Sequence, residues 1–213
     1  MKIGIAGGHG KIALLLSRIL RDAGHEVVGI IRNPEHADDL REAGAEPLVL
    51  DLEQSSPDEL AGHLVGADAV VFAAGAGAGS GAARKLTVDR DGAILLADAA
   101  EAAGVQRIVV VSAISTDEFD PGSDDVFQVY LRAKSEADAD IRARTLDWTI
   151  VRPGSLTDDA PTGHVQAGDT VPNGSIPRAD VAAVLAQVLT RHRAIRRQFE
   201  VTSGETPIAD AAF

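Results

Sequence analysis

The sequence has no cysteine among its 213 residues. Disulfides, thiolate metal sites and cysteine nucleophiles are therefore excluded. The six histidines are scattered along the chain, and no two of them stand at the spacing of a metal-ligand pair. We therefore predict no metal site and expect the histidines to lie on the surface or in turns. Only His9 is of further interest, because it stands inside a glycine-rich stretch.

Positive charge is scarce, since 20 basic residues face 32 acidic ones and the net charge is -12. Nucleic acids and anionic membranes bind clustered Lys and Arg, so neither is expected as a partner. No apolar run approaches the roughly 18 residues that a membrane-spanning helix needs. The chain begins in a strand-like segment rather than an apolar leader. We therefore expect a cytoplasmic protein that acts on a small molecule.

What the sequence does have is a short apolar strand, a glycine turn and a helix within residues 1–20. The turn has the spacing Gly7-x-x-Gly10-x-x-Ala13, a variant of the dinucleotide-binding turn. Glycines let the backbone approach a pyrophosphate, and a helix N-terminus offers unpaired N–H groups to it. The alternative is an ordinary strand-to-helix turn of an α/β protein.

Further strands are expected where the sequence is apolar and rich in β-branched residues, at 26–31, 46–50, 69–73, 107–112 and 147–152. Helical stretches separate them, at 34–43, from 57, at 82–103 and at 125–144. Strands that alternate with helices at this spacing form a parallel sheet covered on both faces. The sequence thus predicts an α/β fold with a doubly wound parallel sheet.

From residue 153 onwards the sequence becomes rich in Gly, Pro, Asp and Thr. We expect a hairpin of 164–166 with 170–172, a helix at 178–189, a strand at 199–201 and a short helix from Pro207. This stretch is a candidate wall of a substrate pocket, and the alternative is a surface excursion. The chain is interpreted as one domain, with a dinucleotide-binding core at 1–152 and a small C-terminal substrate-side lobe at 153–213.

The end of the second strand carries Arg32, with no acidic residue until Glu35. NAD(H) usually meets an acidic residue there, whereas a guanidinium can clamp the 2′-phosphate of NADP(H). We therefore expect NADP(H) in preference to NAD(H), with Lys11 as a helper. Asp51, after the third strand, suits the adenine edge. The alternatives are a solvated loop cation for Arg32 and a helix-capping role for Asp51.

Tyr130 is the sole tyrosine, and Lys134, one of four lysines, follows it by one helical turn. A cation near a phenol favours the phenolate and lowers the tyrosine pKa. With a hydroxyl such as Ser112 nearby, the pair would serve as a general acid toward a carbonyl oxygen. The alternative is an ordinary Tyr–Lys pair on a helix surface.

The motifs GGHGKIA at Gly7, IIRNP at Ile30, VFAAG at Val71, YLRAK at Tyr130 and LDWTIVRPGSLTDD at Leu146 occur in one order along the chain. With them the sequence resembles an atypical short-chain dehydrogenase/reductase, closest to small NAD(P)H-binding proteins of the NmrA-like or sugar-epimerase type with a Rossmann-like fold. The resemblance implies catalytic roles for Ser112, Tyr130 and Lys134. Cofactor contacts are expected at Gly7, Gly8, His9, Gly10, Lys11, Ile12, Arg32, Asp51, Leu52, Ala73, Ala74, Gly75, Lys134 and Pro153.

The sequence departs from that pattern at Ala13, which replaces a glycine, and in a long gap between Ser112 and Tyr130. We expect an NADP(H)-dependent oxidoreductase that reduces a small carbonyl, quinone or flavin-like acceptor. The alternatives are a non-catalytic NADP(H)-responsive regulator and a sugar-nucleotide epimerase or dehydratase. Residues 74–81 are expected to form a mobile lid, or else a plain connector. A homodimer through the long helices is a further expectation of the resemblance.

Overall fold

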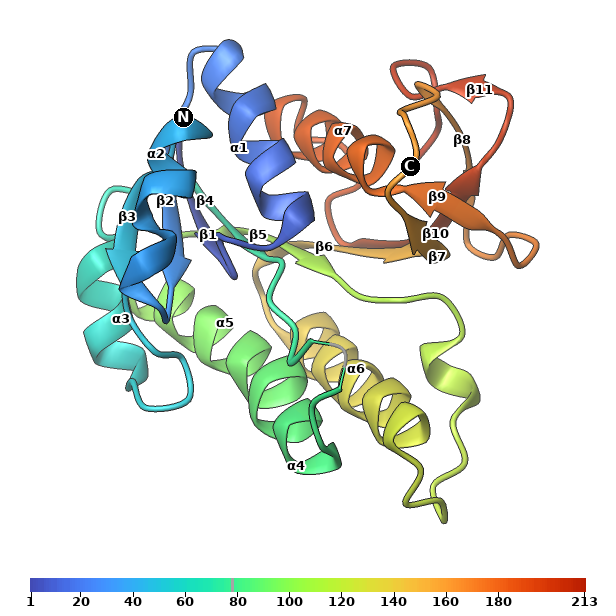
Figure 1. Cartoon of the computed structure of the whole chain (residues 1–213), viewed down its shortest axis with the longest axis horizontal. Helices are drawn as coiled ribbons and strands as arrows, with labels where there is room; N and C mark the ends of the chain where they lie inside the picture. Colours follow the sequence, from blue (N-terminus) through green and yellow to red (C-terminus); the bar gives the residue numbers. More distant parts are fainter. Residues whose placement is uncertain (78) are drawn as a thin grey trace.

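The computed structural model describes residues 1–77 and 79–213. These residues form a sheet with the strand order β11-β8-β10-β6-β5-β4-β1-β2-β3 (Figure 1). Its central strands pair in parallel, which confirms the doubly wound α/β architecture. The bounds of these strands are β1 Lys2–Ala6, β2 Glu26–Ile31, β3 Glu46–Val49, β4 Ala69–Phe72, β5 Arg107–Val111 and β6 Asp147–Pro153.

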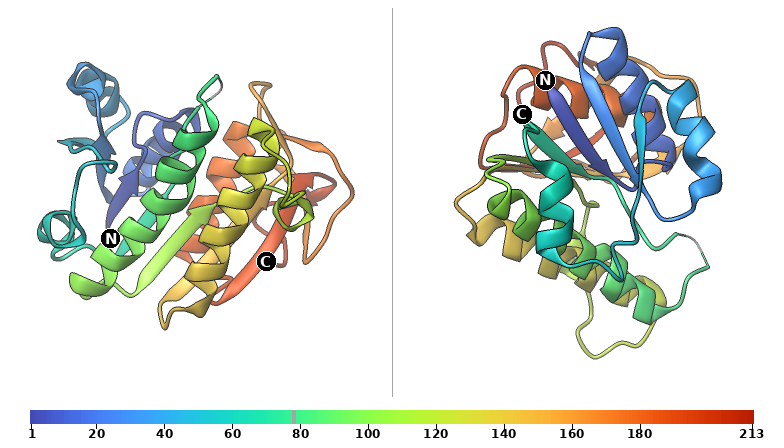
Figure 2. Two further views of the ribbon diagram at one scale, coloured as in Figure 1. Left: turned by 90° about the horizontal axis from the view of Figure 1, so that it is seen from below. Right: turned by 90° about the vertical axis from the view of Figure 1, so that its left-hand side faces the viewer.

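Helices cover both faces of the sheet, so two hydrophobic layers form (Figures 1 and 2). On one face lie α1 (Lys11–Asp22), α2 (Ala37–Glu42) and α7 (Arg178–Thr190). On the other lie α3 (Pro57–Leu64), α5 (Gly92–Ala102) and α6 (Val126–Ala143). Strands β4 and β5 are buried along their whole length, which explains their uninterrupted apolar sequences.

The helix expected at 82–103 is interrupted by a π-helical segment. A short α4 (Ala82–Arg84) leads into η2 (Lys85–Asp91), and α5 follows from Gly92. The wider turn of a π-helix changes which side chains face inward. Asp89 lies in this π-helical segment and is buried, at 1% exposure.

The C-terminal segment joins the same sheet, but not as expected. The predicted hairpin is wrong, because β8 (His164–Gly168) pairs antiparallel with β10 (Arg197–Ser203) and β11 (Thr206–Pro207). Strand β10 is longer than the predicted 199–201 and offers β8 a continuous edge, whereas Pro172 has no N–H to give a hairpin partner. The sheet is consequently mixed rather than purely parallel.

Two other details of this region differ from expectation or were not foreseen. The helix predicted from Pro207 is wrong, since Thr206 and Pro207 form β11. Two short strands, β7 (Ser155–Thr157) and β9 (Ser175–Pro177), make a separate parallel pair beside the sheet. They bring both ends of the loop-rich stretch next to the end of β6, where the chain leaves the sheet. Across the described residues, no helix has the length and apolar character needed to cross a bilayer.

Candidate functional site

The glycine turn between β1 and α1 packs so closely that side chains would not fit. Gly7 has a φ of +79°, and a Cβ there would lie 2.5 Å from the Cα of Ala74. A Cβ on Gly8 would lie 2.7 Å from the Cα of Gly29 in β2. Gly10 caps α1 without a side-chain hydrogen bond, and the first turn of α1 holds no acidic residue. The amides at this helix end are thus available to an anion, as a dinucleotide phosphate requires.

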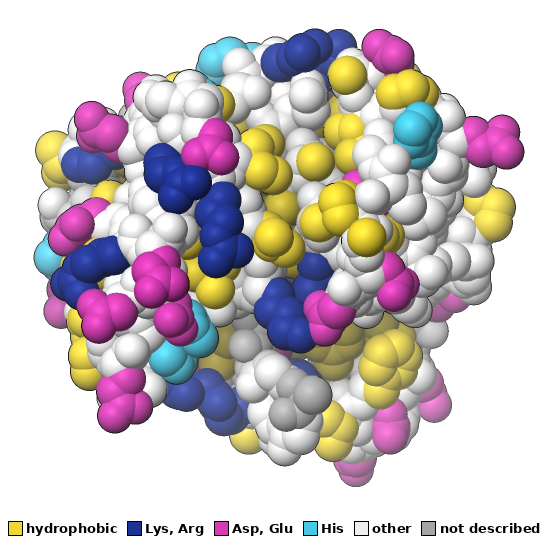
Figure 3. Space-filling model, turned by 45° about the horizontal axis from the view of Figure 1, so that its top comes forward, with side chains coloured by type: hydrophobic (Ala, Val, Ile, Leu, Met, Phe, Trp, Pro, Cys, Tyr) yellow, Lys and Arg dark blue, Asp and Glu magenta, His cyan; other side chains and the backbone are white. Residues whose placement is uncertain are grey.

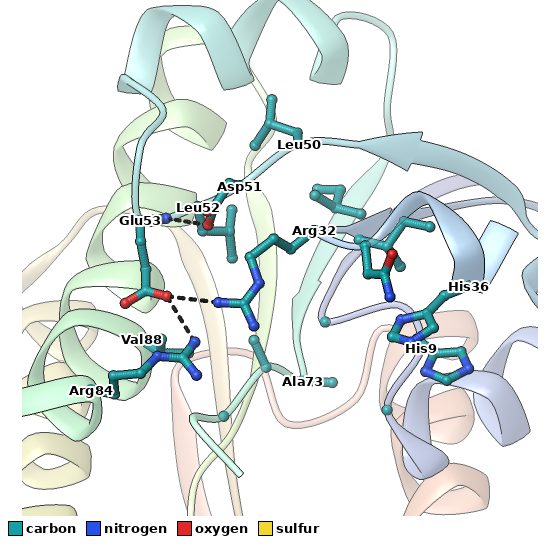
Figure 4. A pocket seen from close by; sticks show the side chains of 17 residues that line it. His9, Arg32, His36, Leu50, Asp51, Leu52, Glu53, Ala73, Arg84 and Val88 are labelled. Atoms are coloured by element: carbon teal, nitrogen blue, oxygen red, sulfur yellow. Dashed lines mark hydrogen bonds and ion pairs between the residues drawn. The ribbon is translucent and has the colours of Figure 1, made fainter. Parts of the chain in front are cut away.

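A cavity of about 340 Å³ lies beside this turn, at the carboxyl ends of β1 to β4. In a doubly wound sheet this is where nucleotides bind. Its lining combines the glycine turn, the ends of β2 and β3, the segment after β4 and the start of the 82–91 helix (Figure 4). The lining residues are Gly7, His9, Gly10, Ile30, Ile31, Arg32, Asn33, His36, Leu50, Asp51, Leu52, Glu53, Ala73, Ala74, Gly75, Arg84 and Val88.

Two guanidinium groups converge on one carboxylate in this cavity. Arg84 Nη2 donates to Glu53 Oε2 at 2.8 Å, and Arg32 Nη1 donates to the same oxygen at 3.2 Å (Figure 4). The Thr87 hydroxyl donates to the other carboxylate oxygen at 2.7 Å. These bonds, that from Arg84 foremost, hold the pKa of Glu53 below its usual range. Glu53 is therefore ionised at neutral pH and orders both arginines.

Opposite this cluster, two histidine rings stack at the other wall of the cavity (Figure 4). The rings of His9 and His36 lie 3.6 Å apart between centroids and 13° from parallel. His9 Nε2 also lies 2.7 Å from the Asp39 carboxylate. This contact ties the glycine turn to the start of α2, so the expected His9 contact with a cofactor would come from a ring already held in place.

The three predicted catalytic residues lie at the end of β5 and on α6. Lys134 is buried, and its Nζ donates to the carbonyl of Val111 at 3.1 Å and lies 3.5 Å from Asp89. Ser112 is also buried, and its hydroxyl donates to Asp138 at 2.8 Å. Tyr130 lies one helical turn before Lys134, with the Lys85 ammonium 5.4 Å from its ring. None of the three lines the cavity described above.

The tyrosine pKa differs from the expectation. Burial raises the pKa of Tyr130, and the nearby Lys134 charge only partly offsets that effect. Desolvation disfavours the phenolate more than the Lys134 charge favours it. The negative charges of Asp89 and Asp138 nearby raise the pKa further. Tyr130 is therefore a neutral phenol at neutral pH.

A buried ionic network lies beneath Ser112. Arg152 donates from Nε to Asp138 Oδ2 at 2.9 Å and from Nη1 to Asp117 at 2.7 Å. Asp138 is fully buried, and its Oδ1 has no hydrogen-bond partner among the described residues. Burial raises the pKa of Asp138 although Arg152 and Ser112 oppose the change. The network fixes Ser112 and anchors the segment that holds Asp117 after β5.

The remaining predicted residues fall into two groups. Nine of the expected cofactor contacts line the cavity, namely Gly7, His9, Gly10, Arg32, Asp51, Leu52, Ala73, Ala74 and Gly75. Gly8 packs behind the turn, Ile12 is buried in the core and Pro153 ends β6. Asp51 Oδ1 accepts the Glu53 amide at 3.0 Å, so it stabilises its own turn. The lid expected at 74–81 includes residue 78, which lies outside the described residues.

Lys11, expected to assist at the 2′-phosphate, instead bonds Asp158, which also accepts from Arg178 at 2.7 Å. These residues line a second cavity of about 370 Å³ between α1, residues 157–161 and the start of α7. Figure 3 shows this side of the molecule, where basic side chains lie among acidic and hydrophobic ones rather than in one patch.

Three residues of the site were not predicted from the sequence, namely Glu53, Arg84 and Asp138. A signal existed for Asp138, which continues the Tyr130–Lys134 face by one more helical turn. No sequence spacing links Glu53 to Arg84, because Glu53 lies between β3 and α3 whereas Arg84 lies in α4. Among residues 1–77 and 79–213 no cluster of three His, Asp or Glu side chains is arranged to hold a metal.

Residues 7–192 match a family described as NAD(P)H-binding. The chain is 36% identical over 212 residues to the "Uncharacterized sugar epimerase YhfK" of Bacillus subtilis, covering 99% of this chain and 98% of that protein. A candidate NAD-dependent epimerase/dehydratase of Bacillus halodurans superposes with a TM-score of 0.89 at 37% identity, over 98% and 97% of the two chains. The oxidoreductase ylbE of Lactococcus lactis gives 0.85 at 28% identity, over 98% and 93%.

Proposed function

Because the chain belongs to the NAD(P)H-binding family, we propose that it is an oxidoreductase that uses NADP(H) in preference to NAD(H). The observation that carries the proposal is the cavity at the carboxyl ends of β1 to β4, with its glycine turn at one end and two arginines at the other. Gly7 and Gly10 leave room for a pyrophosphate against the start of α1.

The preference for NADP(H) rests on the charge at the end of β2. Arg32 and Arg84 both line the cavity, and Glu53 is the acidic side chain bonded to them. A guanidinium binds phosphate through paired, charge-assisted hydrogen bonds. No acidic side chain stands at position 32, where NAD(H)-dependent relatives of this fold use one for the ribose hydroxyls.

When bound, the cofactor would supply a hydride to an acceptor. In our proposal Tyr130 gives the accompanying proton from its hydroxyl, and its raised pKa keeps that proton in place until a developing oxyanion takes it. Lys134, held by Val111 O and Asp89, provides the positive charge that stabilises the phenolate left behind. Ser112, fixed by Asp138, positions the acceptor.

The proposed acceptor is a small carbonyl, quinone or flavin-like compound. The name of the L. lactis neighbour supports an oxidoreductase, whereas those of the Bacillus proteins favour a second candidate, an epimerase or dehydratase. Residues after β6 supply only β7 to β11 and α7, and three of those strands, β8, β10 and β11, belong to the main sheet. This leaves little chain for a sugar-nucleotide domain, so we favour the oxidoreductase.

The proposal is tested by calorimetric titration with NADPH and NADH, followed by NADPH oxidation with a panel of aldehydes, ketones, quinones and flavins. We expect binding of NADPH at least 10-fold tighter than NADH and turnover of one acceptor class. Tyr130→Phe should reduce turnover by roughly 100-fold, the usual range for loss of a general acid, with NADPH affinity unchanged. Absence of turnover with every acceptor, or an active Tyr130→Phe variant, would show that the mechanism is wrong. A cofactor that copurifies without net redox change would favour the epimerase.

A further inference from the structure

We propose that Arg84 is a second ligand of the 2′-phosphate and that Glu53 competes with that phosphate for both arginines, so the three side chains together set the cofactor preference. The inference rests on the proposed function, since it concerns the same cavity. Nothing in the sequence motif around Arg32 assigns a role to Glu53 or Arg84.

Arg32 comes from the end of β2 and Arg84 from α4, yet both guanidiniums reach the same Oε2 of Glu53, at 3.2 and 2.8 Å. Two like charges meet in this way only around an anion that offsets their repulsion. A phosphate has three acceptor oxygens and about two negative charges, so it suits a pair of guanidiniums better than one carboxylate does.

Arg32, Glu53 and Arg84 line one cavity together with Gly7 and Gly10, which mark the pyrophosphate end. The Arg32 side chain is 56% exposed and that of Arg84 39%, whereas the Glu53 side chain is 18% exposed. The arginines thus keep donors open to the cavity while the carboxylate is turned toward Thr87 and its own ion pairs.

Arg32, Arg84 and Glu53 together carry one net positive charge, and the depressed pKa of Glu53 keeps this balance at neutral pH. A 2′-phosphate placed between the arginines would also approach Glu53, which repels it. The same carboxylate would accept hydrogen bonds from the ribose hydroxyls of NAD(H). Glu53 therefore weakens NADP(H) binding, and Arg84 strengthens it.

The test is calorimetric titration of the whole protein with 2′,5′-ADP and with ADP, as well as with NADPH and NADH. Arg84→Gln should weaken binding of 2′,5′-ADP and NADPH by roughly 10-fold and leave ADP and NADH within about 3-fold. Glu53→Gln should strengthen the binding of 2′,5′-ADP several-fold and weaken the binding of NADH. Arg90→Gln is the matched control, because Arg90 stands on the same helical segment but pairs with Asp91 and Glu136 away from the cavity.

The outcomes are separable. If Arg84→Gln affects all four ligands equally, or none, the role of Arg84 is overturned. If Glu53→Gln weakens 2′,5′-ADP, the competition is overturned and Glu53 acts as a scaffold for the arginines. If 2′,5′-ADP binds in the predicted way but no acceptor is reduced, the inference stands and the oxidoreductase proposal fails. Arg84→Lys, which keeps the charge and loses the planar fork, gives an intermediate value and guards against a folding defect.

Discussion

At the scale of single residues, Asp138 is held in place by burial together with two hydrogen-bond donors. It is fully buried on α6 and accepts from Ser112 and Arg152, and Arg152 is itself 4% exposed. A buried ion pair contributes little net stability as a pair, but loss of one partner leaves a charge that has no compensation. We therefore expect position 138 to tolerate neither a shorter side chain nor a positively charged one.

We expect Asp138→Ala to lower the free energy of unfolding by about 3–5 kcal/mol, since it leaves Arg152 with Asp117 alone. Asp138→Asn keeps an acceptor and should cost less. Asp140→Ala is the control on the same helix, because the Asp140 side chain is 35% exposed and its partner Arg144 also pairs with Asp98 and Glu101. Urea unfolding of the three variants measures these differences. Equal losses in Asp138→Ala and Asp140→Ala would contradict the role of burial.

Asp117 gives a prediction in pH. Hydrogen bonds from Arg152 hold the pKa of Asp117 below its ordinary value. A carboxyl with a lowered folded-state pKa adds stability above its unfolded pKa, and this contribution disappears as the pH falls through the folded value. Asp117→Asn should therefore reduce stability at pH 7, and by less below about pH 4. Thermal unfolding of both proteins from pH 3 to 7 would test this, and a constant difference over that range would disprove it.

At the scale of elements, the β1–α1 turn shows how close packing creates a binding site. Gly8 and Gly29 bring the turn against β2, and Gly8 N donates to Ile30 O at 2.9 Å. A Cβ at Gly29 would first meet the Leu40 side chain, at 2.4 Å, whereas a side chain at Gly8 would force the turn away from the sheet. The amides at the head of α1 would then no longer point where the phosphates are expected.

Gly8→Ala should lower stability by about 1–3 kcal/mol through overpacking and weaken NADPH binding by at least 10-fold. Gly62→Ala is a matched control, since Gly62 lies within α3 and a Cβ there meets nothing within 4 Å. That change should raise stability by about 0.5–1 kcal/mol and leave binding intact. Melting temperatures and calorimetry report both effects. If Gly8→Ala binds NADPH like the wild type, the turn does not hold the phosphates.

Elements were predicted well from the sequence where local pattern decides them, and less well where distant partners do. The apolar runs of β1, β2, β4, β5 and β6 are buried on both faces, so composition alone revealed them. The π-helical Lys85–Asp91 has no distinctive pattern, and β8 depended on an edge that the chain supplies some thirty residues later. In the site, Arg32 could be predicted as a residue of the cavity because it stands directly after β2. Its partner Glu53 is 21 positions away, and Arg84 is 31 beyond Glu53.

At the scale of the whole molecule, the C-terminal segment is part of the core rather than an addition to it. Strand β10 pairs with β6 through five residues, and Phe199 is 1% exposed beneath α7 and against Phe213. The 1–152 segment therefore lacks α7 and the strands β8 and β10, which supply Val165, Phe199 and Val201 to the hydrophobic layer that covers β1 and β5.

Phe199→Ala should lower the free energy of unfolding by about 3–5 kcal/mol and the melting temperature by roughly 6–20 °C in a single transition. Phe127→Ala, at a 60% exposed position on α6, should change stability by less than about 0.5 kcal/mol. Calorimetric unfolding distinguishes the cases. Two separate transitions, or a small loss in Phe199→Ala, would mean that the C-terminal segment folds independently of the rest.

The two outermost strands of the sheet are both very short, and each contains a proline. Strand β3 carries Pro47 and has four residues, whereas β11 has two, the second of them Pro207. Since proline has no N–H to donate to a neighbouring strand, both edges of the sheet are poor sites for pairing with a strand of another chain. Extended polymers built by strand addition at either edge of the sheet are therefore disfavoured.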